Sequence, residues 1–429
     1  MSEYNDEFIE FPKDWDVRRL NEIAIIRSGF SERKRDENSK VIHLRPDNID
    51  NETDRIVFHR IVYIPESPKI ERYLLRHLDI VLVNTNGSIN HIGKLGIIDM
   101  PLNQKITFSN HLTAIQIVSK DVEPYYIYYL LSWYHLNGSF KKVVKNQAGK
   151  WNLNLDTIRN LLIPIPPPEE QKKIAEILNT VDSIIIDTTN LIEKLKILKE
   201  KTLNLLITGK IWHKEFKDTE IGKIPKNWEI KRLKDVIIKA KSGGTPRRNI
   251  PEYWNGNIPF AKAQDITKSD KYLYNTEEFI TEKGLENSNA WIVPENSLLL
   301  TIYGSLGFVA INKIPVTTNQ AIVGIIPNKN IIDTEFLYYW YLYFEPYWSK
   351  FIKKSTQPNL TLEIVLNSSI PIPPLEEQKK IAEILSTIDN KIETEKKYLD
   401  YMKKLKEKLL AALMTGKIRV NSISIGDTK

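Results

Sequence analysis

The chain has 429 residues, 41% of them hydrophobic and 27% charged, which is typical of globular protein and leaves room for two or three domains. It contains no cysteine, which excludes disulfides and thiolate metal sites and favours a cytoplasmic protein. No apolar run reaches the ~18 residues that a membrane span needs, and the acidic start at 1–8 is not typical of a secretory signal. The net charge of +7 is spread so evenly that no predicted domain is strongly basic, so bulk charge indicates little about a partner.

Two similar segments open two domains. Residues 11–23 (FPKDWDVRRLNEI) align with residues 224–236 (IPKNWEIKRLKDV), which places Trp15 opposite Trp228. In the first domain, short apolar runs bounded by turn residues predict strands within 41–49, 55–64, 79–88, 95–99 and 113–118. A tyrosine-rich stretch at 123–136 then predicts an amphipathic helix. The second domain repeats this order and reaches a similar stretch at 334–348.

The strongest repeat follows each domain. Fifteen of the sixteen residues in 163–178 (IPIPPPEEQKKIAEIL) recur in 370–385, which lies 207 positions later. The offset is still 207 where TGKI at 208–211 recurs at 415–418. Because no insertion separates the two copies, we interpret them as one structural unit used twice.

Each copy predicts one long helix, from Glu169 to about Ile207 in the first. Pro168 suits the first turn, the two glutamates favour the positive end of the helix dipole, and Gly209 suits a left-handed stop. Apolar residues recur at spacings of three and four, which predicts a heptad seam. The residues expected to pair the helices and dock partners are Ile177, Val181, Ile184, Leu191, Leu195 and Leu198 in the first copy, and Ile384, Ile388, Tyr398, Met402, Leu405 and Leu409 in the second.

A long helix with one apolar stripe needs a packing partner in water. The presence of two matched helices favours pairing with each other. The alternative is that each helix lies along a globular core.

The usual catalytic and cofactor motifs are absent from the sequence. There is no GxxxxGK[ST] for ATP phosphates and no GxGxxG for a dinucleotide, and the histidines lack metal-ligand spacing. EPYY at 123–126 and EPYW at 345–348 resemble only superficially a motif of adenine methyltransferases, and helix edges explain them better.

Polar and basic loop residues are the remaining candidates for chemistry. Arg, Lys, Asn and Gln side chains can read base edges, while Ser, Thr and Lys can hold phosphates. Each of them could equally be an ordinary solvated residue. The candidate DNA contacts are Arg33, Lys34, Arg35, Arg45, Asn48, Asn84, Asn86 and Ser88 in the first domain, and Lys241, Thr245, Arg247, Arg248, Lys262, Gln264, Ser305 and Gln357 in the second.

The order of a tryptophan-containing start, a PIPP-EEQKKIAEIL helix ending in TGKI, a second domain and a second helix resembles the specificity subunit of type I restriction-modification systems. The resemblance covers nearly the whole chain, and the twofold PxPPxxEQxxIAxxL signal is highly specific. It implies two DNA target-recognition domains that read an asymmetric, bipartite target. It also implies that the long helices form a spacer on which methyltransferase subunits dock.

Several positions carry this resemblance. SGGTP at 242–246 and STQPNL at 355–360 look like family features of a recognition domain, whereas the first domain has SGFSERK and NQAGKWNL at the matching places. Equivalent contacts in the first half are therefore less well defined. The scaffold positions that match the family are Pro164, Pro166, Glu170, Gln171, Ile174 and Gly209, and their partners Pro371, Pro373, Glu377, Gln378, Ile381 and Gly416.

We therefore expect an α+β fold in which two duplicated, mixed α/β recognition domains are separated by two long antiparallel coiled-coil helices with pseudo-twofold symmetry. The expected divisions are 1–163 and 212–370 for the domains, 164–211 and 371–420 for the helices, and 421–429 for a tail.

The expected function is sequence-specific binding of double-stranded DNA by a non-catalytic subunit without cofactor or metal. The expected partners are two methyltransferase subunits, which use S-adenosylmethionine to methylate adenine, and restriction subunits reached through the complex, with no membrane involved. The alternatives are a coiled-coil scaffold that does not bind DNA and a fused methyltransferase-specificity enzyme.

Overall fold

The structure is a computed structural model that describes residues 11–50, 55–58, 60–99, 103–147, 149–350 and 360–420. It divides into two compact units: unit 1 comprises residues 1–191 and 395–429, and unit 2 comprises residues 192–394. Both divisions fall within the long helices α5 (Pro168–Ile207) and α10 (Leu375–Met414). Each unit therefore holds one half of each long helix.

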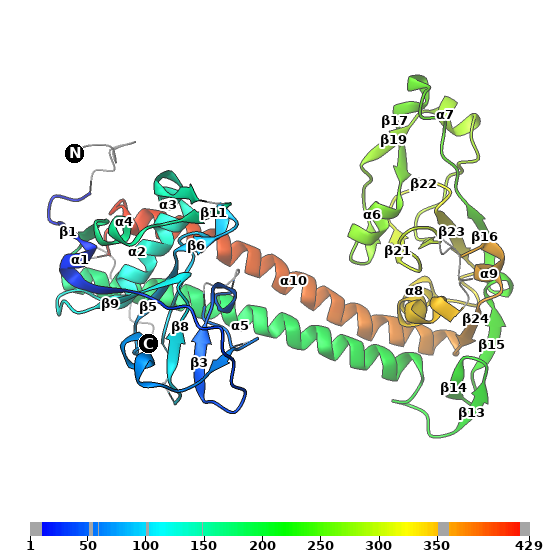
Figure 1. Ribbon diagram of the computed structural model, residues 1–429. Coiled ribbons are helices and arrows are strands. Elements are labelled where there is room, and N and C mark those ends of the chain that lie inside the picture. The colour runs from blue at the N-terminus through cyan, green and yellow to red at the C-terminus, as the bar shows by residue number, and fades with distance from the viewer. Residues whose placement is uncertain are drawn as a thin grey trace, which may run out of the picture. The chain divides into compact units, whose positions relative to one another are not determined.

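Unit 1 is built on two sheets (Figure 1). A four-stranded antiparallel sheet has the order β2-β9-β5-β7, and a three-stranded sheet has the order β4-β3-β8 with β3 parallel to β8. Two smaller sheets, β1-β12 and β10-β11-β6, complete the unit. The strands are β1 (Asp16–Arg19), β2 (Ala24–Ser28), β3 (Val41–Leu44), β4 (Tyr63–Ile64), β5 (Ile80–Val83), β6 (Thr85–Asn86), β7 (Leu95–Ile97), β8 (Ile106–Phe108), β9 (Leu112–Ile117), β10 (Lys145–Gln147), β11 (Lys150–Asn152) and β12 (Leu162–Ile165).

The tyrosine-rich helix of unit 1 is α2 (Pro124–Leu136), and it is buried on almost every side from Tyr126 to Trp133. A helix that is apolar all round has to be enclosed, and α2 shares one hydrophobic core with the four-stranded sheet and the long helices. The tyrosine hydroxyls still find acceptors, since Tyr126 donates to the Pro164 carbonyl at 2.7 Å. The short helices of unit 1 are α1 (Leu20–Ile23), α3 (Ser139–Val143) and α4 (Leu155–Arg159).

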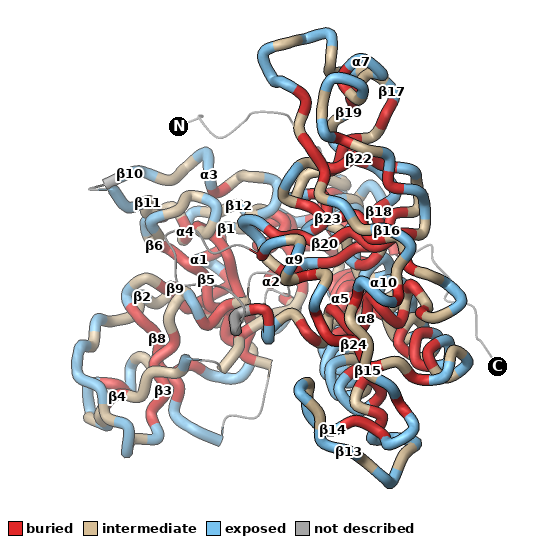
Figure 2. The backbone as a smooth tube through the Cα atoms, turned by 90° about the vertical axis from the view of Figure 1, so that its right-hand side faces the viewer, coloured by how far each residue is buried: buried red, intermediate tan, exposed pale blue. Residues whose placement is uncertain are grey.

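Unit 2 repeats this plan with additions. Its larger sheet has five strands in the order β16-β23-β20-β21-β18, and its smaller sheet has the order β19-β17-β22. β20 and β23 are buried along nearly their whole length (Figure 2). The strands are β13 (Phe216–Thr219), β14 (Gly222–Pro225), β15 (Glu229–Arg232), β16 (Ile237–Ser242), β17 (Trp254–Ala261), β18 (Tyr272–Leu273), β19 (Glu278–Ile280), β20 (Leu298–Thr301), β21 (Val309–Asn312), β22 (Thr317–Thr318), β23 (Ile322–Pro327) and β24 (Ser369–Ile372).

Four shorter helices accompany these strands, and the tyrosine-rich α8 shares the main hydrophobic core of unit 2 with the larger sheet. These helices are α6 (Ala263–Lys268), α7 (Glu282–Glu286), α8 (Thr334–Phe344) and α9 (Leu362–Leu366).

The two long helices pack against each other in opposite directions within each unit. In unit 1 the start of α5, at Ile174 and Leu178, shares a core with the end of α10, at Leu410 and Leu413. In unit 2 the end of α5, around Leu206, shares a core with the start of α10. The predictions of two long helices, of their antiparallel pairing and of two mixed α/β domains are confirmed.

The predicted helix ends are confirmed as well. Gly209 and Gly416 have φ values of +71° and +66°, where glycine carries no Cβ penalty. A Cβ on either glycine would lie 2.3 Å from a proline ring carbon, that of Pro225 or Pro12 respectively. The repeated TGKI segment thus allows the start of each domain to pack closely against the end of a helix.

The predicted seam between the long helices is correct only in part. Leu191, Leu198 and Tyr398 are 38%, 49% and 44% exposed. The predicted residues Val181, Ile184, Met402, Leu405 and Leu409, by contrast, pack in one hydrophobic cluster. The spacing of three and four is correct, but toward its two ends α5 buries a neighbouring apolar row in the domain cores, at Ile174 and Leu178 in unit 1 and at Leu203 and Leu206 in unit 2. Val181 and Met402 are buried as predicted, whereas Ile177, Ile184, Leu195, Ile384, Ile388, Leu405 and Leu409 are half-buried. The buried row of α5 contains Ile174, Leu178, Val181, Ile185, Thr188, Ile192, Leu203 and Leu206.

The strand predicted within 55–64 is mostly absent, because only Tyr63–Ile64 forms a strand and Ile56 makes a single bridge to Ile49. The finer domain divisions at 163, 211 and 370 stay predictions. Among the described residues, no helix is long and apolar enough to cross a membrane.

Candidate nucleic-acid interface

In unit 1 four chain segments meet where strands end. Ser28, the last residue of β2, pairs with Thr113 in β9, and Val83, the last residue of β5, pairs with Leu112. The end of β3 pairs in parallel with the end of β8. The loops that follow β2, β3, β5 and β8 therefore start side by side around residues 109–113, and we call this the strand-end surface of unit 1.

Unit 2 has the same arrangement around residues 318–322. Ser242 at the end of β16 pairs with Val323, Thr301 at the end of β20 pairs with Ile322, and Ala261 at the end of β17 pairs with Thr318. We call this the strand-end surface of unit 2. All the described candidate residues of each unit lie on the strand ends that meet at these two surfaces or on the segments that follow them, with Gln264 in α6.

One glycine fixes the first loop of each surface. A Cβ on Gly29 would lie 2.1 Å from the Ser109 carbonyl oxygen, and a Cβ on Gly243 would lie 2.0 Å from that of Thr318. Only glycine permits such an approach of two backbones. The SG dipeptides at 28–29 and 242–243 thus set the position of both loops.

The candidates in unit 1 differ in exposure. Arg33, Lys34 and Arg35 are exposed on the loop after β2, and Arg45, Asn86 and Ser88 are half-buried. The side-chain oxygen of Asn86 accepts from the Ser88 backbone N–H at 3.0 Å, so it stabilises the turn that holds both residues. The exposed side chains of Arg33, Lys34 and Arg35 are therefore open to an anionic partner.

Two predicted contacts in unit 1 are buried. Asn48 is 3% exposed, accepts from the Arg45 backbone N–H and donates to the Val57 carbonyl. Asn84 is 7% exposed and donates to Thr113 Oγ1 at 2.9 Å. Both side-chain amides form hydrogen bonds beneath the loops and stabilise them. They are therefore not candidates for direct contact with DNA.

The candidates in unit 2 are mostly exposed. Lys241, Arg247, Arg248, Gln264 and Ser305 reach solvent, and Lys262 and Thr245 are half-buried. Thr245 Oγ1 donates to Gln320 Oε1 at 2.6 Å, which joins the loop after β16 to the connection between β22 and β23. Gln357 lies outside the described residues.

Several residues at these surfaces are not among the candidates that the sequence predicted. Trp254 and Glu278 lie beside Arg248, and exposed Gln320 lies beside Thr245. Asn110 and Lys150 are exposed at the surface of unit 1. The alignment of Ser109-Asn110-His111 with Thr318-Asn319-Gln320 was the one signal in the sequence that could have identified two of them.

Two histidines near the surface of unit 1 are held neutral. Burial, together with the charge of Arg45, lowers the pKa of His43 to about 4, and its Nδ1 lies 3.0 Å from Thr107 Oγ1. Burial and the nearby Lys150 also lower the pKa of His111. Neither histidine therefore adds positive charge near pH 7.

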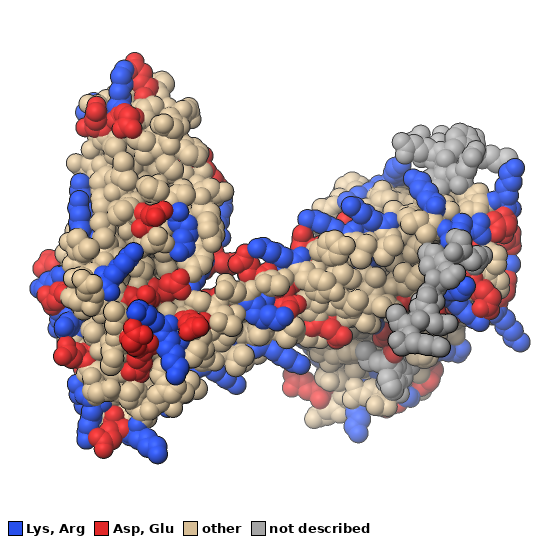
Figure 3. All heavy atoms as spheres, turned by 180° about the vertical axis from the view of Figure 1, so that it is seen from behind, with Lys and Arg blue, Asp and Glu red and all other residues tan. Residues whose placement is uncertain are grey.

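Basic and acidic side chains are interspersed on the face of each unit that Figure 3 shows. This agrees with the near-balanced charge of the sequence. Attraction for an anionic partner thus has to come from local groups on the strand-end surfaces.

A glutamine anchors each tyrosine-rich helix to a long helix. Gln171 Oε1 accepts from the Glu123 backbone N–H at 2.9 Å, just before α2, and Gln378 Oε1 accepts from that of Asp333 at 2.8 Å, just before α8. Each Nε2 donates to a carbonyl of the PIPP segment, that of Pro166 or Pro373. Both ends of the side-chain amide of this glutamine, the last residue of the repeated EEQ motif, therefore form hydrogen bonds that stabilise the fold.

An aspartate on each long helix makes a second, charged anchor. Asp182 accepts from the Tyr129 hydroxyl at 2.8 Å and pairs with Lys406 at 2.8 Å in unit 1. In unit 2, Asp389 accepts from Tyr339 at 2.6 Å and pairs with Lys199 at 2.6 Å. The aspartates lie 207 positions apart, and so do the lysines.

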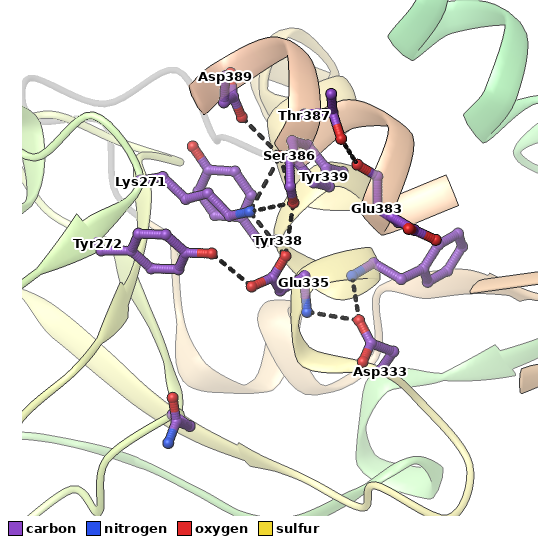
Figure 4. A network of polar contacts seen from close by, with 12 residues as sticks. Lys271, Tyr272, Asp333, Glu335, Tyr338, Tyr339, Glu383, Ser386, Thr387 and Asp389 are labelled. Atoms are coloured by element: carbon purple, nitrogen blue, oxygen red, sulfur yellow. Dashed lines mark hydrogen bonds and ion pairs between the residues drawn. The ribbon is translucent and has the colours of Figure 1, made fainter. Parts of the chain in front are cut away.

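Unit 2 surrounds this anchor with a larger network (Figure 4). Lys271, whose side chain is 7% exposed, donates to Glu335, Tyr339 and Ser386. Burial lowers the pKa of Lys271 although the hydrogen bond to Glu335 opposes this. The network joins β18, α8 and α10, so it fixes the recognition part of unit 2 to its half of the long helices.

Comparison with known proteins identifies the family. A family model described as the type I restriction modification DNA specificity domain matches residues 12–197 and 225–403. A Methanocaldococcus jannaschii protein named after the MjaX type I restriction enzyme is 30% identical over 421 residues, which cover 97% of this chain and 96% of that protein. The MjaVIII specificity subunit of the same organism is 31% identical and covers 75% of this chain and 77% of its own.

A solved structure supports the fold. The crystal structure of the type I restriction-modification S subunit from M. genitalium has a TM-score of 0.62 at 16% identity, over 96% of this chain and 99% of that chain. Because two copies of the family model span most of the sequence and one relative matches it nearly end to end, the chain belongs to the type I restriction-modification DNA specificity family.

Proposed function

We propose that the chain is the specificity subunit of a type I restriction-modification complex, and that each strand-end surface reads one half of a bipartite DNA target. The observation that carries the proposal is the convergence of the exposed Arg, Lys, Gln and Ser candidates at equivalent strand ends in both units. Phosphate contacts position such a protein on DNA, and base-edge contacts select the sequence.

The two half-sites should differ. The frame of the two surfaces is the same, with Gly29 and Gly243 at matched places, but the loops carry different side chains. Arg33, Lys34 and Arg35 follow the frame in unit 1, whereas Thr245, Arg247 and Arg248 follow it in unit 2. Different donors and acceptors recognise different base edges, so the target is asymmetric.

The long helices are the proposed docking site for two methyltransferase subunits. Their outward rows leave large apolar side chains in water: Leu191, Tyr398 and Tyr401 in unit 1, and Ile197, Leu198 and Leu205 in unit 2. Exposed apolar residues that follow one helix row are typical of a protein interface.

In this division of labour the chain positions the complex and the methyltransferase subunits flip and methylate the target adenine. Restriction subunits join through the same complex.

An exchange of recognition domains tests the proposal. Replacing residues 212–370 with the matching segment of a relative should change one half of the methylated motif and leave the other half intact, as mapped by methylome sequencing of cells with the methyltransferase subunit. A motif that changes in both halves, or in neither, contradicts modular reading.

A mobility shift with random duplex at low salt tests the alternative of a scaffold that does not bind DNA. Complete absence of binding by the assembled complex would favour that alternative.

A further inference from the structure

One cation on the strand-end surface of unit 2 is locked in place. The Arg248 guanidinium carbon lies 3.8 Å from the centroid of the Trp254 ring, and its Nη1 lies 2.7 Å from a carboxylate oxygen of Glu278. The Arg248 side chain is nevertheless 54% exposed. Its plane and one of its nitrogens are therefore fixed while much of the group faces solvent.

The residues that hold Arg248 belong to the smaller sheet. Trp254 starts β17 and Glu278 starts β19, and these two strands pair, with Phe260 opposite Glu278. The Trp254 ring packs edge-on against Phe260 at 5.3 Å, and its Nε1 donates to the Arg247 carbonyl at 3.2 Å. The loop that carries Arg248 is thus fastened to the sheet on its own side.

Glu278 also neutralises a second cation, because its other oxygen accepts from Lys262 Nζ at 2.9 Å. The pKa of Glu278 is lowered although burial opposes this, since the hydrogen bond from Lys262 and the ion pair with Arg248 outweigh burial. A carboxylate between two cations weakens their attraction for phosphate. The arrangement therefore suits a neutral group that accepts directed hydrogen bonds better than it suits a phosphate.

We propose that Arg248 reads a guanine in the major groove of the half-site bound by unit 2, with Trp254 and Glu278 as positioning residues. This inference rests on the proposed function. Arginine that donates two hydrogen bonds to O6 and N7 of guanine is the commonest specific base contact.

Such a contact requires a guanidinium in a fixed plane with free N–H groups. Nε and Nη2 of Arg248 have no protein partner among the described residues, so this edge of the fork is available. The same fork could also bind a phosphate, but the nearby carboxylate of Glu278 would repel that anion and would not repel the neutral edge of a guanine.

The proposal can be tested by selecting the DNA duplexes that the protein binds from a randomised library. The protein used is the full chain, purified together with the subunits that stay bound to it. Arg248→Ala should lower discrimination at one G·C pair by on the order of 10- to 100-fold and leave the other selected positions unchanged. Arg248→Lys keeps the charge but lacks the planar fork, so it should lose most of the same preference. A uniform loss of affinity with an unchanged motif would overturn the proposal, because it would make Arg248 a phosphate contact.

Two further variants separate reading from bulk charge. Arg247→Ala, at the exposed neighbour, should weaken binding evenly across sequences and lower the salt slope by about one. Glu278→Gln should act in two directions: discrimination at the same G·C pair falls, while affinity for random duplex rises. If Glu278→Gln leaves the preference for that pair intact, the positioning role is wrong.

The outcome for the wild-type chain keeps the two proposals apart. A wild-type complex that selects no motif contradicts the proposed function itself. A wild-type complex that selects a bipartite motif, which Arg248 variants retain in full, contradicts this inference alone.

Discussion

The two units hold the long helices with the same residues but surround those residues differently. In each unit a tyrosine of the tyrosine-rich helix, an aspartate and a lysine form one anchor. Beyond the anchor the two networks diverge. Unit 2 places Lys271 between Glu335 and Ser386, whereas unit 1 pairs Arg55 with Asp99, whose carboxylate also accepts from Tyr125.

This difference shows which part of the duplicated frame is constrained. A buried charge that loses its partner costs several kcal/mol, but a different partner can serve equally well. The anchor has to satisfy two helices and a domain at once, so its aspartate and lysine recur at an offset of 207 and its tyrosine recurs at an offset of 210. The charged groups next to the anchor need only neutralise each other, and they differ between the two units.

The largest effect should follow the removal of an anchor aspartate. Asp182→Ala leaves Lys406 without its partner in a site where these side chains are 3% and 12% exposed, and about 3–5 kcal/mol of stability should be lost. Asp389→Ala should cost less, because Asp389 and Lys199 are 18% and 23% exposed. Urea unfolding of both variants checks the order, and an equal loss in the two units would contradict it.

Replacement of either of two matched core leucines should lower the stability of the fold by nearly the same amount. Leu178 and Leu385 lie 207 positions apart and are both fully buried, so each change to alanine should cost about 2–5 kcal/mol. Thermal unfolding measures the loss. Leu198→Ala is the control, because its side chain is 49% exposed. A control that destabilises as much as the buried pair would show that the buried row is misassigned.

An acid-dependent contribution is expected in unit 2, from Glu335. Burial opposes it, but hydrogen bonds from Lys271, Tyr272 and Ser386 hold the pKa of Glu335 below 4.5. A carboxyl with a lowered pKa in the folded state stabilises it above the ordinary value, and this stability is lost as the pH falls below about 4.5.

Glu335→Gln should therefore cost about 1.5–3 kcal/mol at pH 7 and less at pH 3.5, by urea unfolding at both values. A Glu335→Gln penalty that is the same at both pH values would contradict the assignment.

The smallest effect on stability should come from the outward row of the helices. Tyr401→Ala in unit 1, where the side chain is 62% exposed, should change stability by less than about 0.5 kcal/mol. It should nevertheless reduce co-purification of the methyltransferase subunit if the row docks that partner. If both Tyr401→Ala and Leu198→Ala still co-purify with the methyltransferase subunit as the wild-type chain does, the docking site does not lie on this row.

Local features of the sequence determined much of this fold. Heptad spacing, a proline before Glu-Glu and a terminal glycine predicted α5 almost to the residue, because each acts within a few positions along the chain. The constant offset of 207 predicted one structural unit used twice, and Asp182 and Asp389, which are separated by that offset, make equivalent contacts in the two copies. The sequence also singled out loops that carry the candidate residues, but the strand pairing of the folded chain brings these loops together.

Only the tertiary structure decided that Leu178 of α5 is buried and that Leu191 is exposed, since the two side chains are equally apolar and the domain core covers only Leu178. It also decided that Asn48 and Asn84 turn inward, while Arg248 is fixed on the surface by Trp254 and Glu278. These outcomes depend on residues that are six to thirty positions away and are brought close by strand pairing. A pattern along the chain does not contain that information, because the energy of a polar side chain depends on the partners that surround it after folding.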